Sequence, residues 1–347
     1  MMTIREIAEL AGVSPATVSL VLNDKDGVSV ETRQRVRAFL EESGYHQKRS
    51  YNRTDRKNIR FIKYKDKGLL VEHNGEFITR VIDGIEDGAR SAGINLKITN
   101  VTSDNLEQMF EEINAEQDDG IIFLGTEYRA EDFDFLKKLT APVVVVDNEM
   151  RNQSFDAVVM NNENAVFSAV SYLKSLGHTR IGHIRSEYVT DNFHAREVGF
   201  LRAMQEENLP VNSADTYYVQ PDLDTSYEML LKYAEDRRDF PTAFFADNDI
   251  LAVGALRAFR QAGKRVPDDI SVIGMDDLML ASISEPLLTT LKIHKKTMGK
   301  MAVSRLMDKI FEGDQTILKI LVDAELVVRD STGPHVGKST EQSDVKL

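Results

Sequence analysis

From Ile59 onward, short apolar runs alternate with longer amphipathic segments, and this alternation limits the possible folds more than any other feature. We interpret the apolar runs as strands at 59–64, 94–99, 120–125, 143–147, 180–184, 243–246 and 270–276. Helices are expected between them, at about 77–91, 104–115, 161–176, 194–207, 225–237, 249–262 and 295–311. Short strands that alternate with helices are typical of parallel sheets. These strands and helices are too many for a single sheet with its covering helices. The pattern therefore predicts an α/β fold with two lobes and a ligand site at the carboxyl ends of the strands.

Composition adds several exclusions. The 347 residues suffice for two to three domains, and 42% hydrophobic with 29% charged residues is typical of soluble globular proteins. No apolar stretch reaches the length of about 18 residues that a membrane span needs. The N-terminus lacks the basic-then-apolar pattern of a signal peptide. Without cysteine there are no disulfides and no thiolate metal site. We expect a cytoplasmic protein without a metal or cofactor.

The charge distribution is uneven along the chain. The net charge is −13, yet the first 60 residues hold 11 basic and 8 acidic side chains. Six of these basic residues and a single acid lie within 47–60. A small basic head on an acidic body favours a DNA-contacting end. A merely solvated basic linker is an equally good explanation of the charge alone.

Capping residues predict three short helices before residue 46. Thr3 and Glu6 fit a capping box, and Gly12 fits a left-handed helix end. Ser14, followed by proline, and Ser29 fit the N-caps of two further helices. These two helices are expected at about 15–22 and 30–43.

The second of these helices has a slim outer face. The side chains there are small or short: Ala16, Thr17, Ser19 and Leu20. A slim helix after a tight glycine turn fits a helix-turn-helix, whose second helix enters a major groove about 12 Å wide. An ordinary three-helix bundle has the same caps, so the spacing alone leaves both interpretations open.

The residues of this segment decide between them by resemblance. TIREIAELAGVSPATVSLVLND, then VSVETRQRVRAFLEESGY, closely resembles the DNA-binding head of the LacI/GalR repressor family. The resemblance implies that DNA is contacted by Thr3, Ser14, Ala16, Thr17, Ser19, Leu20 and Asn23. Leu20 stands where many members carry an arginine that reads guanine. Because leucine donates no hydrogen bond, we expect an apolar or relaxed preference at that base.

The linker departs from the family pattern. Members usually have Tyr-x-Pro-Asn, an Ala-Arg pair and a leucine that wedges into the minor groove. The proline, the pair and the leucine are absent from residues 45–58. Phosphate contacts from Lys48, Arg49 and Arg53 are still expected, and Tyr51 is a possible substitute wedge. Whether a hinge helix kinks the DNA stays open.

Polar residues follow several predicted strands of the body. Asp147, Asn248 and Asp276 stand at or just beyond strand ends. Carboxylates there suit pairs of sugar hydroxyls. Capping of the following helices is the competing explanation.

The body also resembles the LacI/GalR family, in its periplasmic-binding-protein-like effector domain. The matching segments are AVSYLKSLGHTRIGHI, AREVGFLRAM, PTAFFADNDILAVGAL, VPDDISVIGMDD and PLLTTLKIHKKTMGKMAVSRLMDKI. The resemblance implies effector contacts by Arg196, Asn248 and Asp276, and less directly by Asp147. Phe193 could stack on a sugar ring, although a lone phenylalanine is more often core. Phe77 keeps the frame of a family motif after the first strand.

That first strand is followed by a longer segment than family members have. The sequence 65–76 contains a lysine-rich turn and Gly68, which could form a hairpin. We therefore expect the part of the effector pocket formed by this segment to differ from that of other family members.

The resulting domain organisation has four parts: 1–46 a helix-turn-helix domain, 47–58 a basic linker, 59–330 the effector and dimerisation domain, and 331–347 a disordered tail. Within the body, the N-lobe is expected at about 59–158 plus 290–318, and the C-lobe at about 159–289 plus 319–330.

The sequence thus predicts a transcriptional repressor that binds double-stranded operator DNA as a homodimer or tetramer, under control of a small-molecule effector, by resemblance a sugar. An exported solute-binding protein and a family member with a protein corepressor are the alternatives. An enzyme is not expected. Phosphate-binding loops, nucleophile elbows and His-Glu-x-x-His motifs are missing, and adjacent Asp276 and Asp277 should point apart. His178 and His183 lack the spacing of a helical metal pair.

Overall fold

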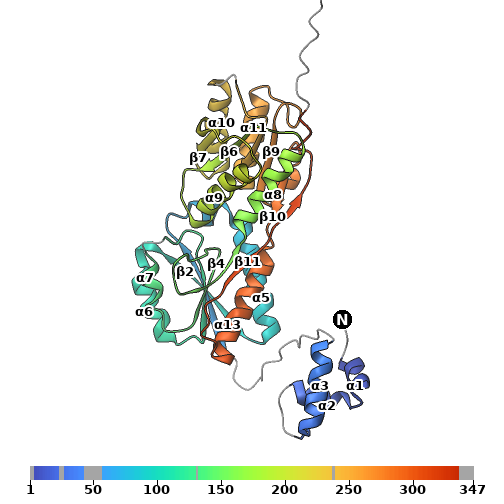
Figure 1. Ribbon diagram of the computed structural model, residues 1–347. Coiled ribbons are helices and arrows are strands. Elements are labelled where there is room, and N and C mark those ends of the chain that lie inside the picture. The colour runs from blue at the N-terminus through green and yellow to red at the C-terminus, as the bar shows by residue number, and fades with distance from the viewer. Residues whose placement is uncertain (1–3, 23–26, 43–56, 130–131, 237–238, 336–347) are drawn as a thin grey trace, which may run out of the picture. The chain divides into compact units, whose positions relative to one another are not determined.

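A computed structural model describes residues 4–22, 27–42, 57–129, 132–236 and 239–335 (Figure 1). The chain divides into two compact units, Met1–Thr54 and Asp55–Leu347. Each unit has its own apolar core.

The first unit consists of three helices: α1 (Ile4–Ala11), α2 (Pro15–Leu22) and α3 (Val30–Glu42). The predicted caps at Gly12, Ser14 and Ser29 are confirmed. Gly12 has φ 66°, Ser14 Oγ accepts a hydrogen bond from Thr17 N at 3.0 Å, and Ser29 Oγ accepts one from Thr32 N at 3.2 Å. The core is formed by Ile7, Ala8, Ala11, Val18, Val21 and Val36. Thr3 and residues 43–56 lie outside the described residues, so the capping box and the hinge helix stay predictions.

The second unit contains two sheets, one in each lobe. The N-lobe sheet has the order β11-β5-β4-β3-β1-β2, and all its pairings are parallel. Its strands are β1 (Asn58–Lys65), β2 (Asn95–Thr102), β3 (Gly120–Leu124), β4 (Val143–Val146), β5 (Asp156–Met160) and β11 (Lys319–Val322).

The C-lobe sheet has the order β12-β10-β9-β8-β6-β7 and is parallel except for the edge strand β12. Its strands are β6 (Ile181–Ser186), β7 (Thr216–Val219), β8 (Ala243–Ala246), β9 (Ser271–Asp276), β10 (Thr289–Lys292) and β12 (Glu325–Val327). The predicted α/β fold with two mainly parallel sheets is confirmed.

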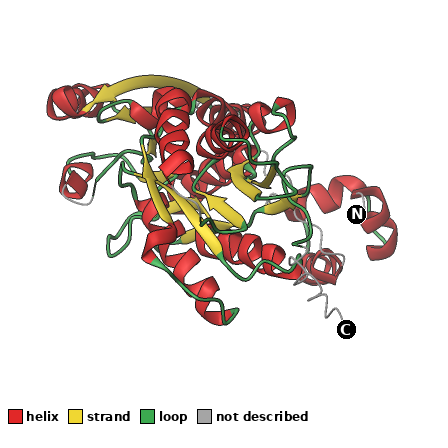
Figure 2. Ribbon diagram, turned by 90° about the horizontal axis from the view of Figure 1, so that it is seen from above, coloured by secondary structure: helices red, strands yellow, loops and turns green. Residues whose placement is uncertain are grey.

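Helices cover both faces of each sheet, as Figures 1 and 2 show. The N-lobe helices are α4 (Leu69–His73), α5 (Gly75–Ala92), α6 (Leu106–Glu116), α7 (Phe133–Leu136) and α13 (Lys295–Glu312), with a 3-10 turn at Ser103–Asn105. The C-lobe helices are α8 (Asn162–Ser175), α9 (Asp191–Glu206), α10 (Leu223–Asp236), α11 (Asp249–Gln261) and α12 (Met279–Ile283), with a 3-10 turn at Ser213–Asp215. The neighbours Phe244 and Phe245 point to opposite faces: Phe244 packs with Phe259 of α11, and Phe245 with Phe200 of α9. Among the described residues, no helix combines the length and apolar character needed to cross a membrane.

The chain passes between the lobes at residues 160–162, 292–295 and 322–325. The third passage corrects the expected division of the lobes. Residues 319–330 were expected in the C-lobe, but β11 pairs in parallel with β5 in the N-lobe sheet, and only then does the chain return to β12. The N-lobe gains an edge strand because the chain leaves α13 beside β5. The expected N-lobe segment 290–318 also begins too early, because β10 pairs with β9 in the C-lobe sheet. The second passage between the lobes therefore follows β10.

The expectation of a disordered tail from residue 331 is wrong for its first five residues. Ser331 Oγ donates to Val272 O at 2.6 Å and accepts from Thr289 N at 2.8 Å. His335 stacks on His178 with a centroid distance of 5.5 Å. These polar residues are ordered because they complete hydrogen bonds of the C-lobe sheet. Residues 336–347 lie outside the described part.

The hairpin expected around Gly68 is also not formed. Gly68 has φ 75°, but it precedes the short helix α4, which leads into α5. Backbone N–H groups of this segment are bound by a distant carboxylate instead of by a partner strand.

Helices α5 and α13 approach each other through two glycines. A Cβ atom added at Gly84 would overlap the backbone carbonyl of Lys296, and one at Gly299 would overlap that of Val81. The two backbones therefore touch without an intervening side chain, which a rigid backbone contact can tolerate only with glycine.

We expect Gly84→Ala to lower the free energy of unfolding by roughly 1–3 kcal/mol, because the methyl group forces the helices apart. Urea unfolding of the full chain, followed by circular dichroism, measures this. Gly75→Ala is the matched control, since nothing lies within 4 Å of a Cβ at Gly75. Equal stability of the two variants would contradict the close packing.

Candidate functional site

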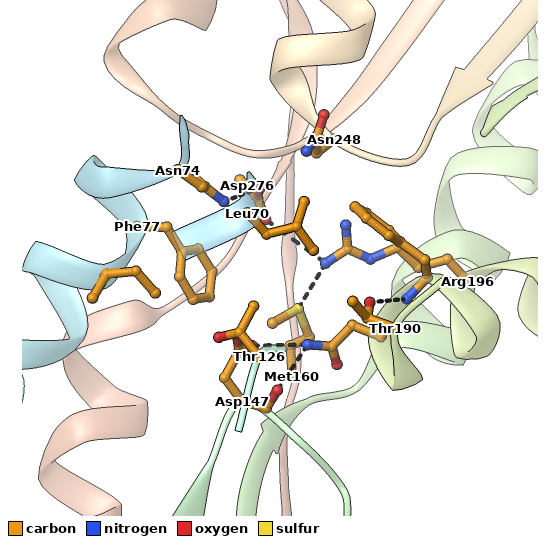
Figure 3. Close-up of a pocket in the computed structure, with 13 residues that line it drawn as sticks. Leu70, Asn74, Phe77, Thr126, Asp147, Met160, Thr190, Arg196, Asn248 and Asp276 are labelled. Atoms are coloured by element: carbon orange, nitrogen blue, oxygen red, sulfur yellow. Dashed lines mark hydrogen bonds and ion pairs between the residues drawn. The ribbon is translucent and has the colours of Figure 1, made fainter. Parts of the chain in front are cut away.

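The two lobes enclose one small cavity at the carboxyl ends of their strands (Figure 3). It is lined by Leu70, Asn74, Phe77, Ile78, Thr126, Asp147, Met160, Thr190, Asn192, Phe193, Arg196, Asn248 and Asp276. The structure thus brings together all six residues proposed from the sequence: Phe77, Asp147, Phe193, Arg196, Asn248 and Asp276. The cavity measures about 30 Å³, which is space for one or two water molecules.

Asp147 follows β4 and is held in the cavity wall by its neighbours. Its backbone has φ 67°, a left-handed conformation that aspartate and asparagine tolerate. Its Oδ2 accepts a hydrogen bond from Thr126 Oγ1 at 2.5 Å. Asn192 Nδ2, from the opposite lobe, donates to Oδ1 at 3.0 Å and to the carbonyl of Asp147 at 2.9 Å. The side chain of Asp147 therefore ties the lobes directly.

Arg196 lies on α9 and is buried to 4% exposure, so its charge needs several partners. Its Nε donates to Asn162 Oδ1 at 2.9 Å, and one terminal nitrogen donates to the carbonyl of Asp247. The other terminal nitrogen lies 3.1 Å from Met160 Sδ and 3.9 Å from Asp276 Oδ1. The guanidinium also lies 5.3 Å from the centroid of the Phe193 ring.

Asp276 ends β9 with φ 119°, an unusual conformation for a residue other than glycine. Its Oδ2 accepts from Asn74 Nδ2 of the N-lobe at 3.3 Å. Two buried acceptors stay without a hydrogen bond: Asp276 Oδ1 and Asn74 Oδ1. Both residues line the cavity, so this end of it offers two open acceptors to a ligand that donates hydrogen bonds.

The alternative roles considered for some of these residues also apply. Asn248 is the N-cap of α11, and its side chain accepts from Leu251 N at 3.0 Å while the residue lines the cavity. Phe193 and Phe77 are buried and line the cavity as well. Capping, packing and cavity lining are thus combined in the same residues.

Sequence reasoning missed several polar lining residues, namely Asn74, Thr126, Thr190 and Asn192. Thr190 carries a usable signal, because it caps α9 directly after a strand and loop: its Oγ1 accepts from Phe193 N at 3.2 Å. Asn192 carries no such signal, since only the fold brings it to Asp147.

Burial raises the pKa of the acids in this region. Desolvation raises the pKa of Asp147 to about 7, opposed by the Thr126 hydrogen bond and by Arg196. The pKa of Asp276 is raised by the same cause, with Arg196 and Lys295 acting against it. Behind the cavity wall, burial and the neighbouring Asp276 raise the pKa of Asp249 to about 8.

The outer side of α2 forms the candidate DNA interface in the first unit. Ser14 and Ala16 are exposed, and Thr17 and Leu20 are half-buried. Ser19 belongs to α2, but its side chain is not among those described. Thr3, Asn23, Lys48, Arg49 and Arg53 lie outside the described residues. The DNA contacts of all these residues stay predictions.

A helix-turn-helix unit combined with a two-lobed body that encloses a polar cavity defines a ligand-regulated DNA-binding protein. Residues 3–48 match the family model described as bacterial regulatory proteins of the lacI family, and residues 170–332 match a periplasmic binding protein-like domain. The HTH-type transcriptional repressor PurR of Mannheimia succiniciproducens is 30% identical over 337 residues, which are 95% of this chain and 98% of that protein. The chain belongs to the LacI family of transcriptional regulators.

Solved structures agree in fold. The lac repressor dimer bound to operator and the anti-inducer ONPF has a TM-score of 0.70 at 23% identity, covering 96% of this chain and 99% of that one. A LacI family regulator from Enterococcus faecium with bound ribose has a TM-score of 0.67 at 25% identity, covering 81% and 100%. The family consists of DNA-binding regulators and not enzymes, as the sequence predicted.

The raised pKa of Asp147 has a consequence for stability. The folded protein retains this proton up to about pH 7, whereas the unfolded chain loses it near the ordinary aspartate pKa of 3.8. Asp147 therefore lowers the free energy of unfolding as the pH rises from about 4 to 7, by at most about 1.4 kcal/mol per pH unit.

We expect Asp147→Asn to remove this loss, so that the variant gains stability relative to the wild type between pH 5 and pH 7. Urea unfolding at several pH values measures the difference. Parallel pH profiles of the two proteins would show that Asp147 is ionised throughout and would refute the assignment.

Proposed function

We propose that this regulator is a repressor that binds double-stranded operator DNA as a homodimer, with α2 of each subunit contacting the DNA. We further propose that a small sugar, bound in the cavity between the lobes, controls this DNA binding. The observation that carries the proposal is the convergence of hydrogen-bonding side chains from both lobes on one enclosed cavity. Family membership supports the DNA-binding role, and a cytoplasmic location follows from it.

The lining chemistry favours a sugar. The carboxyl groups of Asp147 and Asp276 can form hydrogen bonds with sugar hydroxyls, and Arg196 can donate to ring or hydroxyl oxygens. Phe77 and Phe193 supply apolar surface for the carbon face of a ring. A related regulator binds ribose. These features favour a neutral polyhydroxylated effector over an ionic one.

Effector binding would act on the contact between the lobes. A hexose does not fit into about 30 Å³, so it must replace direct bonds such as Asn192–Asp147 and Asn74–Asp276. Replacing bonds between lobes by bonds through a ligand changes the preferred lobe geometry. The coupling is reciprocal, so DNA must change effector affinity by the same factor.

Dimerisation is proposed from the size of the DNA-binding unit. A single helix-turn-helix buries too little surface for tight binding, and such proteins read two half-sites about one helical turn apart. The related lac repressor is a dimer on its operator. A tetramer would require a further interface.

We expect Arg196→Ala to weaken effector binding by at least about thirtyfold, because the truncation leaves its buried partners unpaired. DNA binding without effector should persist. Calorimetric titration with ribose and glucose, together with gel shifts on a duplex selected from a random library, measures both. Arg202→Ala is the matched control, as Arg202 lies on the same helix with its side chain 65% exposed. An Arg196→Ala protein that responds normally would exclude the proposed cavity.

We expect Thr17→Glu to lower affinity for the selected duplex at least about tenfold, because it places a negative charge against phosphates or base edges. Effector binding should be unchanged. Ala38→Glu adds the same charge on the exposed side of α3 and serves as the control. Unchanged DNA affinity of the Thr17 variant would reject α2 as the recognition helix.

A further inference from the structure

The segment Asp66–Asn74, which includes α4, lies between the inner cavity and a second, outer one. Leu70 and Asn74 line the inner cavity. Lys67, two residues before the start of α4, lines the outer cavity, which measures about 510 Å³. Figure 3 shows the Leu70 side chain directed into the group of cavity residues. We call this segment the lid.

The outer cavity continues the interlobe cleft. Its lining residues come from the loops after β3 and β6 and from the start of α9: Glu127, Tyr128, Arg129, Glu187, Tyr188, Val189, Thr190, Asp191 and His194, besides Lys67. Thr190 lines both cavities, so the two are neighbours. The lid and Thr190 therefore both contribute to the walls of the two cavities.

Glu127 fixes the lid to the N-lobe. Its carboxylate is 1% exposed and accepts four backbone hydrogen bonds from the lid. One oxygen accepts from Asp66 N at 2.9 Å and Gly68 N at 3.0 Å, and the other accepts from Leu70 N at 2.7 Å and Val71 N at 2.9 Å. Bonds to a carboxylate are stronger than those between neutral groups. Since Glu127 follows β3, the lid should remain with the N-lobe when the lobes separate.

Two further contacts hold the lid across the cleft. The Asp66 carboxylate lies 2.9 Å from the Arg129 guanidinium and accepts from the Tyr188 hydroxyl at 3.4 Å. At the other end, Asn74 donates to Asp276. The lid thus contacts the C-lobe at both of its ends, through Tyr188 and Asp276, with Leu70 between them.

We infer that the segment Asp66–Asn74 is a size filter that confines the effector to the inner cavity, with Leu70 blocking the outer cavity and Glu127 positioning Leu70. This inference rests on the proposed function and narrows it to a single-ring sugar in preference to a disaccharide. A second ring would need the space that Leu70 occupies.

The first test compares the binding of glucose and cellobiose by calorimetric titration of the full chain. The wild type should prefer glucose. Leu70→Ala should shift the affinity ratio toward cellobiose about tenfold or more, because several carbon atoms leave the barrier between the cavities. Val71→Ala is the matched control: Val71 is also buried on the lid but does not line the cavity. An unchanged ratio in Leu70→Ala, or a wild type that prefers cellobiose, would overturn the size filter.

The second test needs no ligand. Glu127→Gln leaves one amide oxygen in place of two carboxylate oxygens, so the amides of Asp66, Gly68, Leu70 and Val71 should exchange with solvent deuterium at least about tenfold faster. Glu72→Gln, which neutralises an exposed lid carboxylate that pairs with Lys65, should leave these rates unchanged. Equal exchange in all three proteins would refute the positioning role of Glu127.

The two failures can be told apart. If neither the wild type nor Leu70→Ala binds any sugar, the sugar effector of the proposed function is wrong, and the size filter for sugars fails with it. If the wild type binds glucose but Leu70→Ala keeps its selectivity, the proposed function stands and only the filter is lost.

Discussion

The buried guanidinium of Arg196 is the constraint on which the ligand-binding unit depends. A cation that is 4% exposed must be surrounded by acceptors. It finds them on three separate elements: the start of α8, the end of β8 and the end of β9. All three acceptors belong to the C-lobe, so the same requirement gathers the carboxyl ends of its strands at the cavity, where Asp276 faces the lining residues instead of solvent. Polar convergence in this protein is therefore both a condition of folding and the basis of recognition.

Much of the fold could be predicted because periodicity is local. The seven strands and seven main helices expected from the sequence correspond to observed elements. The missed strands have specific causes. β5 begins with Asp156, an acid that is buried because Arg305 and Lys309 pair with it from α13. β11 pairs with a strand more than 150 residues earlier. The helix α4 could not be predicted, since its first N–H groups are satisfied by Glu127, far away in sequence.

The candidate site shows the same division. Residues at strand ends, such as Asp147 and Asp276, could be found because parallel topology places strand ends at one edge. Asn74 and Asn192 could not, because each becomes a site residue only through a partner in the other lobe. For Asn248 the sequence left helix capping and ligand binding as alternatives. The two roles do not exclude each other, because the same residue caps α11 and lines the cavity.

The contact of α5 with α13 through facing glycines makes the N-lobe difficult to deform. Two backbones in direct contact have no side chains between them that could adopt other rotamers, so we expect α5 and α13 to move as one body. A change in lobe geometry is then expected mainly in the three passages at 160–162, 292–295 and 322–325, where the chain crosses between the lobes. These three short segments are therefore the expected hinges between two more rigid lobes. Sequence changes in these segments would then alter how strongly effector binding changes DNA affinity, without altering which effector is bound.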